Sequence, residues 1–202
     1  MGDGGGLIAW DTATGREIRR FPEVRRLHWH TPLSPDETVI ASAETDGTIR
    51  LWDAGTGREL RALKGHDQQV RVLAFSPDSR RLFSGSSDRT IRVWDVGSGR
   101  CLHVLEGHVA EVDELAVSPD GHWLASTSHF GLGARNDAIR LWDAHTGREV
   151  RQLTPGQKIV FGLAFSPDSR LLAMAGGPPR KFVRGDILIW DVATGKVWRT
   201  LE

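Results

Sequence analysis

One motif recurs at a fixed spacing through the chain and constrains the fold more than any other feature. Trp-Asp stands at Trp10, Trp52, Trp94, Trp142 and Trp190, and Ser-Pro-Asp begins at Ser34, Ser76, Ser118 and Ser166. Each Trp precedes the next Ser-Pro-Asp by 24 residues, and each Ser-Pro-Asp precedes its own Trp by 18, 18, 24 and 24 residues. A period of this length indicates a repeat architecture.

The composition limits the classes of protein that the chain can belong to. With 202 residues, it is long enough for one domain or for part of a larger one. Lys and Arg total 26, as do Asp and Glu, so net charge favours neither nucleic acid nor membrane. No apolar run approaches the ~20 residues of a membrane-spanning helix, and the glycine-rich start lacks the features of a signal peptide. The single cysteine, Cys101, cannot form an internal disulfide and fits a reducing, cytoplasmic location.

The repeat from Gly65 to Leu105 can be divided directly into strands and turns. Short runs rich in β-branched and aromatic residues predict strands over Val70–Phe75, Arg81–Ser86, Thr90–Trp94 and Arg100–Leu105. Ser-Pro-Asp, Ser-Asp-Arg and a Gly-containing stretch separate these runs and predict tight turns. No segment shows a sustained helical period, so each repeat is expected to form a four-stranded antiparallel sheet.

These residues resemble the WD40 family, whose signature is Gly-His, four strands and a closing Trp-Asp in about 40–45 residues. The resemblance covers essentially the whole chain and implies an all-β fold, a WD40-type β-propeller arc in which each repeat is one blade. Four complete four-stranded blades and an N-terminal half-blade are expected. The predicted boundaries are 1–22 for the half-blade, 23–64 for blade 1, 65–106 for blade 2, 107–154 for blade 3 and 155–202 for blade 4.

The number of blades is smaller than the seven that usually close a ring in this family. Two alternatives follow: the chain is part of a longer propeller, or it closes its ring by self-association. In either case, the half-blade hairpin would expose a strand edge and an apolar face until further strands cover them.

The resemblance also implies a hydrogen-bonded network inside each blade. In blade 2 its members are His66, Ser84, Asp88 and Trp94. The same set has the composition of a Ser-His-Asp triad, but a buried Trp needs an acceptor and a carboxylate orients the imidazole, so we predict a structural role. Blade 1 lacks the His, blade 3 has Asn136 in place of the Asp, and blade 4 keeps only Trp190.

Other chemistry finds little support in the sequence. His28 and His30 form the only close histidine pair, without an acidic or cysteine partner nearby, so no metal site is predicted. The glycines before Leu7 lack the Lys-Ser/Thr of a phosphate-binding loop, and no cofactor is expected. Trp29, Arg71, Asp113 and Phe161 begin the innermost strands but share no chemistry.

Two insertions of six residues are not explained by the repeat, one within 128–137 and one within 176–186. Both lie between the second and third strands of a blade, and loops on a rigid scaffold often carry binding sites. A longer solvated hairpin is the alternative. With the loop that enters blade 1, the insertions predict a partner-binding face made of Arg25, Arg26, Arg135, Arg180, Lys181, Phe182 and Arg184. Arg and aromatic residues are enriched at binding hot spots.

The sequence therefore predicts a non-catalytic protein-interaction scaffold that binds a protein partner through an acidic segment. No continuous basic groove is implied, so protein is favoured over nucleic acid. The alternatives are a ligand-binding or enzymatic propeller with a site in the central channel, and a regulatory arc fused to a catalytic domain, because one fold hosts many functions.

Overall fold

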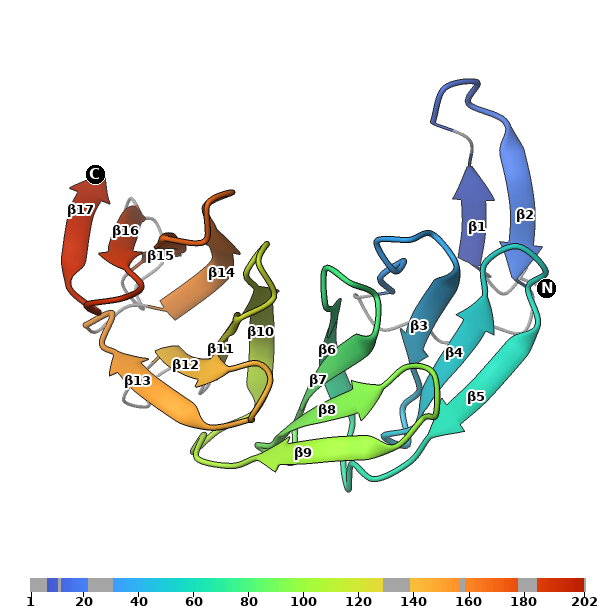
Figure 1. The fold of residues 1–202 in the computed structure, drawn as a ribbon, viewed down its shortest axis with the longest axis horizontal. Helices are drawn as coiled ribbons and strands as arrows, with labels where there is room; N and C mark the ends of the chain where they lie inside the picture. The colour runs from blue at the N-terminus through green and yellow to red at the C-terminus, as the bar shows by residue number, and fades with distance from the viewer. Residues whose placement is uncertain are drawn as a thin grey trace.

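The protein is described by a computed structural model that covers residues 7–10, 12–21, 31–128, 139–156, 159–177 and 185–201. Within these ranges every regular element is a strand, and the strands form five antiparallel sheets. The sheets follow one another around an open arc, with the two ends of the chain at its two tips (Figure 1). The predicted fold class is confirmed.

The strands follow the repeats in order. The N-terminal hairpin consists of β1 (Leu7–Trp10) and β2 (Glu17–Phe21), and the next sheet of β3 (Val39–Ala43), β4 (Ile49–Asp53) and β5 (Glu59–Leu63). Blade 2 contains β6 (Val70–Phe75), β7 (Arg81–Ser86), β8 (Ile91–Asp95) and β9 (Cys101–Leu105). Blade 3 contains β10 (Val112–Val117), β11 (Trp123–Ser128), β12 (Ile139–Asp143) and β13 (Glu149–Leu153). Blade 4 contains β14 (Ile159–Phe165), β15 (Leu171–Gly177), β16 (Asp186–Asp191) and β17 (Val197–Leu201).

Blade 1 differs from the others in its described part. Its sheet has three strands, and the region before them pairs only through an isolated bridge between Leu33 and Ile40. Pro32 accepts a hydrogen bond from the Ala41 amide but has no N–H to donate, which limits the ladder here. The rest of the expected first strand, including His28 and His30, lies outside the described residues.

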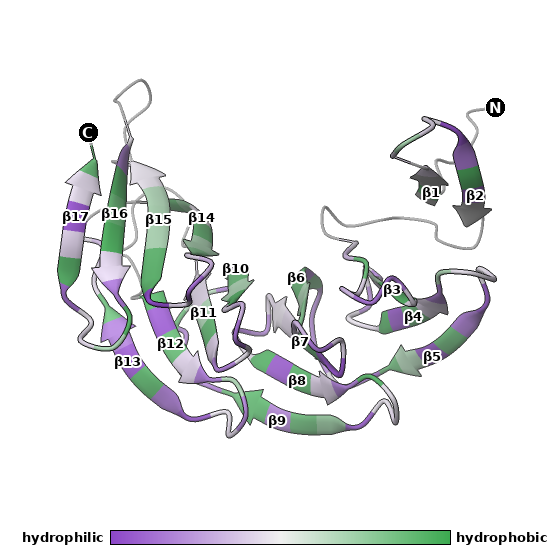
Figure 2. Ribbon diagram, turned by 45° about the horizontal axis from the view of Figure 1, so that its top comes forward, coloured by the Kyte–Doolittle hydropathy of each residue, from purple (hydrophilic) through white to green (hydrophobic). Residues whose placement is uncertain are grey.

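Apolar side chains between neighbouring blades form three separate cores. The first joins Ile49 and Leu51 of blade 1 to Leu82 and Trp94 of blade 2, and two further clusters fill the boundaries between blades 2 and 3 and between blades 3 and 4. Both faces of an inner blade are therefore covered, which explains why strands such as β7 are almost entirely buried. Figure 2 shows apolar residues along the strands of the four blades.

The turn after each Trp-Asp has a repeated local cause. The Asp53 carboxylate accepts hydrogen bonds from the backbone N–H and the hydroxyl of Thr56, and Gly57 adopts a φ of 74°. Asp95 with Ser98 and Asp191 with Thr194 repeat these bonds. A short polar side chain that bonds to the backbone two or three residues on, followed by glycine, explains why the Trp-Asp and Thr-Gly positions recur together.

Candidate functional site

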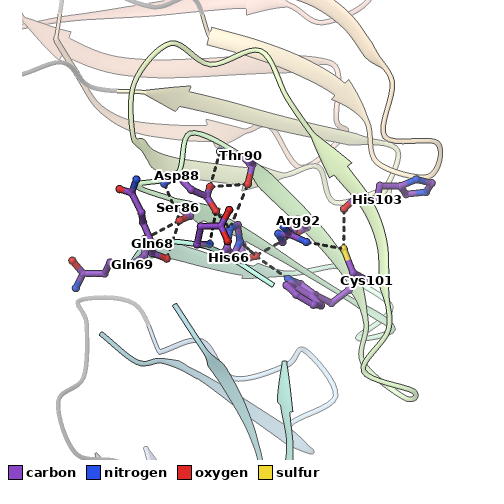
Figure 3. A network of polar contacts seen from close by, with 12 residues as sticks. His66, Gln68, Gln69, Ser86, Asp88, Thr90, Arg92, Cys101 and His103 are labelled. Atoms are coloured by element: carbon purple, nitrogen blue, oxygen red, sulfur yellow. Dashed lines mark hydrogen bonds and ion pairs between the residues drawn. The ribbon is translucent and has the colours of Figure 1, made fainter. Parts of the chain in front are cut away.

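The blade 2 network is one continuous chain of hydrogen bonds (Figure 3). The Trp94 indole Nε1–H donates to Ser84 Oγ at 2.8 Å, Ser84 Oγ lies 2.7 Å from His66 Nε2, and His66 Nδ1 lies 2.7 Å from Asp88 Oδ2. Because a carboxylate only accepts, we assign a proton to Nδ1. With this tautomer, Nε2 accepts a hydrogen bond from the Ser84 hydroxyl. Every donor thus points the same way, from the indole to the carboxylate.

Asp88 fixes the turn between β7 and β8 to the loop that enters β6. Its Oδ1 accepts from the Thr90 N–H at 2.9 Å and from the Thr90 hydroxyl at 2.7 Å, and its Oδ2 accepts from the Asp67 N–H at 3.2 Å. Burial on its own would raise the pKa of Asp88, but the hydrogen bonds from His66 and Thr90 outweigh it and hold that pKa well below its ordinary value. The carboxylate therefore stays ionised in the folded chain.

The network has the order of a catalytic triad, but its hydroxyl is not accessible. Ser84 is 0% exposed and the His66 side chain is 0% exposed. Ser84 Oγ already accepts a hydrogen bond from Trp94, so the indole occupies the space beside the hydroxyl that a substrate would need. We continue to interpret this network as structural.

Partial copies of the network lie in the other blades. In blade 3, His108 Nε2 lies 2.7 Å from Ser126 Oγ, which also accepts from Trp142 at 2.8 Å. In blade 1, Trp52 donates to Ser42 at 2.9 Å. In blade 4, the buried Met174 stands where the others have serine. Asn136, at the Asp position of blade 3, lies outside the described residues.

Charged or aromatic residues stand at equivalent positions where the inner strands of blades 2, 3 and 4 begin. Arg71, Asp113 and Phe161 are the extra residues of β-bulges at equivalent positions of β6, β10 and β14. A bulge redirects its side chain out of the regular pattern. Arg71 pairs through Nε with Asp113 and through Nη1 with Glu111 Oε2 at 2.9 Å, linking blades 2 and 3, whereas Phe161 is 66% exposed.

Glu114 lies beside this charged group and is half-buried. Burial, and then the neighbouring Asp113 carboxylate, raise the pKa of Glu114. Sequence reasoning placed Asp113 and Arg71 at inner-strand starts but missed their ion pair and the role of Glu111. The available signal was opposite charge at equivalent positions of consecutive repeats.

The predicted partner-binding residues are not placed by the structure. Arg25, Arg26, Arg135, Arg180, Lys181, Phe182 and Arg184 all lie outside the described residues. The strands that flank the two insertions are described, and in an antiparallel blade the start of the first strand and the second–third turn lie at the same end. Arg71, Asp113 and Phe161 belong to that end, which we call the entry face.

The described part of the chain offers neither a metal-binding cluster nor a membrane-spanning helix. No group of three or more His, Cys, Asp or Glu side chains there could hold a metal ion. No helix there is long and apolar enough to cross a bilayer. Cys101 is a free, exposed thiol 3.9 Å from Arg92 Nη1.

A cavity of about 610 Å³ lies between the N-terminal hairpin and the sheet of blade 1. Its walls include Ile8, Trp10, Ile18, Leu33 and Ile40. Trp10 is 55% exposed here, whereas the equivalent Trp52 and Trp94 are 3% and 2% exposed. The hairpin therefore lacks the packing that buries the equivalent tryptophan in the blades.

Comparison with known proteins agrees with the geometry of the blades. Residues 21–53, 57–95 and 99–143 match the family model described as WD domain, G-beta repeat. These matches span more than half of the chain, and each ends at the Trp-Asp of its repeat. No curated protein matches the chain. With the strand order, the turn chemistry and the buried tryptophan network in agreement, the chain belongs to the WD40 repeat family.

Proposed function

We propose that the chain is a non-catalytic interaction scaffold that binds a protein segment on its entry face. The observation that carries this proposal is the exposure of Phe161, a large aromatic side chain displayed by a bulge at the start of β14. Exposed aromatic anchors beside charged groups are typical of binding hot spots. WD40 repeats build β-propellers that commonly serve as protein-interaction scaffolds, which supports the same class of function.

The partner that fits best carries an acidic segment. Arg135, Arg180, Lys181 and Arg184 of the two insertions, and Arg25 and Arg26 of the loop entering blade 1, belong by sequence to the same end of the blades as Phe161. Phe182 adds a second aromatic residue in one of these insertions. These cations would surround an aromatic anchor and attract carboxylates from a partner in the cytoplasm.

A selection of phage-displayed random peptides on the purified chain tests this proposal. We expect acidic peptides to be selected, and we expect Phe161→Ser and the triple change Arg180→Ser, Lys181→Ser, Arg184→Ser each to weaken binding of a selected peptide at least about tenfold. Arg170→Ser, in a first–second strand turn at the opposite end of blade 4, is the matched control. Unchanged binding by all variants, with unchanged melting temperatures, would place the site elsewhere.

We further propose that the arc is completed by other strands. The predicted repeat boundaries, with a half-blade over residues 1–22, leave the hairpin short of its first two strands, and its apolar cavity is where such strands would pack. Both self-association and additional blades of a longer propeller would supply them.

A further inference from the structure

The fourth strand of each of the four blades carries a β-bulge at the same position. In blade 1 the pairing passes from Leu51–Arg61 to Trp52–Glu59, so that Leu60 has no opposite residue. The pairings of β8 with β9, β12 with β13 and β16 with β17 shift in the same way, and they leave Leu102, Val150 and Trp198 as the extra residues. These strands form the convex outer side of the arc (Figure 1).

All four bulge residues are large, apolar and exposed. Leu60, Leu102, Val150 and Trp198 are 48%, 43%, 46% and 59% exposed. The neighbouring positions differ in residue type from blade to blade. The residue before the bulge is Glu59, Cys101, Glu149 or Val197, and the residue two positions after it is Ala62, Val104, Gln152 or Thr200. A position that stays apolar while its exposed neighbours vary is not explained by the fold alone, because single exposed apolar residues are tolerated but not required.

A cation precedes each bulge by two residues. Arg58, Arg100, Arg148 and Lys196 are all exposed, and within the described residues none of their side chains joins an ion pair. The nearby carboxylates are engaged elsewhere, since Glu59 binds Arg50 and Glu149 binds Arg140. We call these four cations and the four bulge residues the outer belt.

Hydrogen bonds between blades make the outer belt continuous. In blades 1 to 3 the residue after the bulge reaches the third–fourth strand turn of the next blade. Arg61 donates to the Ser98 carbonyl, His103 Nε2 to the His145 carbonyl, and Arg151 to the Thr194 carbonyl. Arg100, Arg148 and Lys196 follow these turns within three residues. Leu60, Leu102 and Val150 are therefore next in sequence to residues that reach the turn before the cation of the following blade.

We propose that the outer belt binds an acidic amphipathic helix of a partner protein. Each fourth strand is the outer edge of its sheet, but the bulge interrupts its ladder, which disfavours the addition of a partner strand. Recognition then depends on side chains. The apolar bulge residues contact the apolar stripe of the helix, and unpaired cations meet carboxylates on both sides of that stripe. This surface is separate from the entry face and does not depend on it.

The test uses a synthetic helix of about 20 residues with a leucine stripe flanked by glutamates, titrated into the full chain by fluorescence anisotropy. We expect binding that weakens with salt. The triple variant Leu60→Ser, Leu102→Ser, Val150→Ser should lower affinity at least about tenfold, and Arg58→Gln, Arg100→Gln, Arg148→Gln should lower both the affinity and its salt dependence. Val104→Ser, 45% exposed on the same edge strand but two residues beyond the bulge, should leave affinity unchanged.

Three results would overturn the proposal. They are equal binding of a peptide with the same composition in scrambled order, a loss with Val104→Ser as large as with the triple variant, and no binding of the helix while vesicles of phosphatidylcholine and phosphatidylglycerol are bound. The last result would assign the belt to a lipid surface instead. Because the bulge residues are exposed, each variant is expected to keep the wild-type melting temperature, and circular dichroism checks this before titration.

Discussion

At the scale of single residues, Ser84 holds the blade 2 network together, because one hydroxyl serves both Trp94 and His66. Ser84→Ala leaves two buried groups without a partner and is expected to lower the free energy of unfolding by ~2–3 kcal/mol. Ser42→Ala in blade 1 removes the partner of Trp52 alone and is expected to cost about 1 kcal/mol. Urea unfolding of the two variants measures the difference, and equal losses would show that the imidazole adds nothing to the network.

The Asp88 carboxylate makes part of the stability depend on pH. Its pKa in the folded chain lies below the value of ~3.9 expected in the unfolded chain, so the unfolded state binds the proton first as pH falls. The stabilisation is therefore complete above about pH 5 and is lost progressively as pH falls from about 4 toward the lowered pKa of Asp88 in the folded chain. We expect the difference in free energy of unfolding between wild type and Asp88→Asn to be ~1–3 kcal/mol at pH 7 and to shrink on acidification to pH 3. A difference that stays constant over this range would contradict the assignment. The other carboxylates are the same in both proteins, so their contributions to the pH dependence cancel in this difference.

At the scale of turns and strands, hydroxyl groups join the first–second strand turns of neighbouring blades. Ser79 Oγ accepts from the Asp36 amide and Ser169 Oγ accepts from the Asp120 amide, each at 3.1 Å. Between blades 2 and 3 the equivalent residue is Gly121, which has no hydroxyl. One of three blade boundaries therefore lacks this bond.

Ser79→Ala should lower the free energy of unfolding by about 1 kcal/mol through loss of this bond. Ser79→Gly loses the same bond but relieves the left-handed backbone, where Ser79 has a φ of 59°, so we expect it to cost less than the alanine variant. Thermal unfolding of the two variants tests both the loss of the hydrogen bond and the relief of the left-handed backbone. If the glycine variant were the less stable of the two, backbone strain would not matter at this turn.

The order of the strands could be predicted because turn residues mark both ends of each one. Ser-Pro-Asp and Trp-Asp-x-x-Thr-Gly bond to their own backbone and therefore act locally. The bulges could not be predicted, because an extra residue such as Leu60 does not visibly change the alternation of apolar and polar residues in so short a strand. The same holds for links between blades: the His103 imidazole donates to the His145 carbonyl of the next blade, a contact that the pattern within one repeat does not indicate.

For the candidate site, the members of the blade 2 network were identified because the family pattern carries them residue by residue. The Arg71 pairs with Asp113 and Glu111 were not, because they join neighbouring repeats whose relative position depends on packing. Sequence reasoning finds contacts within a repeat more readily than contacts between repeats.

At the scale of the whole molecule, the open end of the arc displays a face that other blades bury. Ile187 and Leu201 of blade 4 are 40% and 39% exposed, whereas Ile139 and Leu153, their equivalents in blade 3, are 0% and 2% exposed. We expect this face to drive concentration-dependent association of the isolated chain, because an apolar sheet face costs free energy in water.

Sedimentation velocity over a range of concentrations measures this association. Ile187→Asp should weaken it by placing a charge on the exposed face, whereas Val109→Ser, a 54% exposed apolar residue in the loop before β10, should not. A single monomeric species at all concentrations in the wild type would show that the face is tolerated in water.

The fluorescence of the buried tryptophans depends on whether the blades remain packed together. Trp52, Trp94, Trp142 and Trp190 are each 2–3% exposed, one per blade, and the chain has no tyrosine to contribute ultraviolet emission of its own. The indoles of Trp94, Trp142 and Trp190 stand at the boundary where one blade meets the previous one. Exposure of any one of them to water shifts its emission to longer wavelength, so four single Trp→Phe replacements would resolve the order in which the blades separate. The repeat that builds the arc thus places one buried indole in each of the four blades.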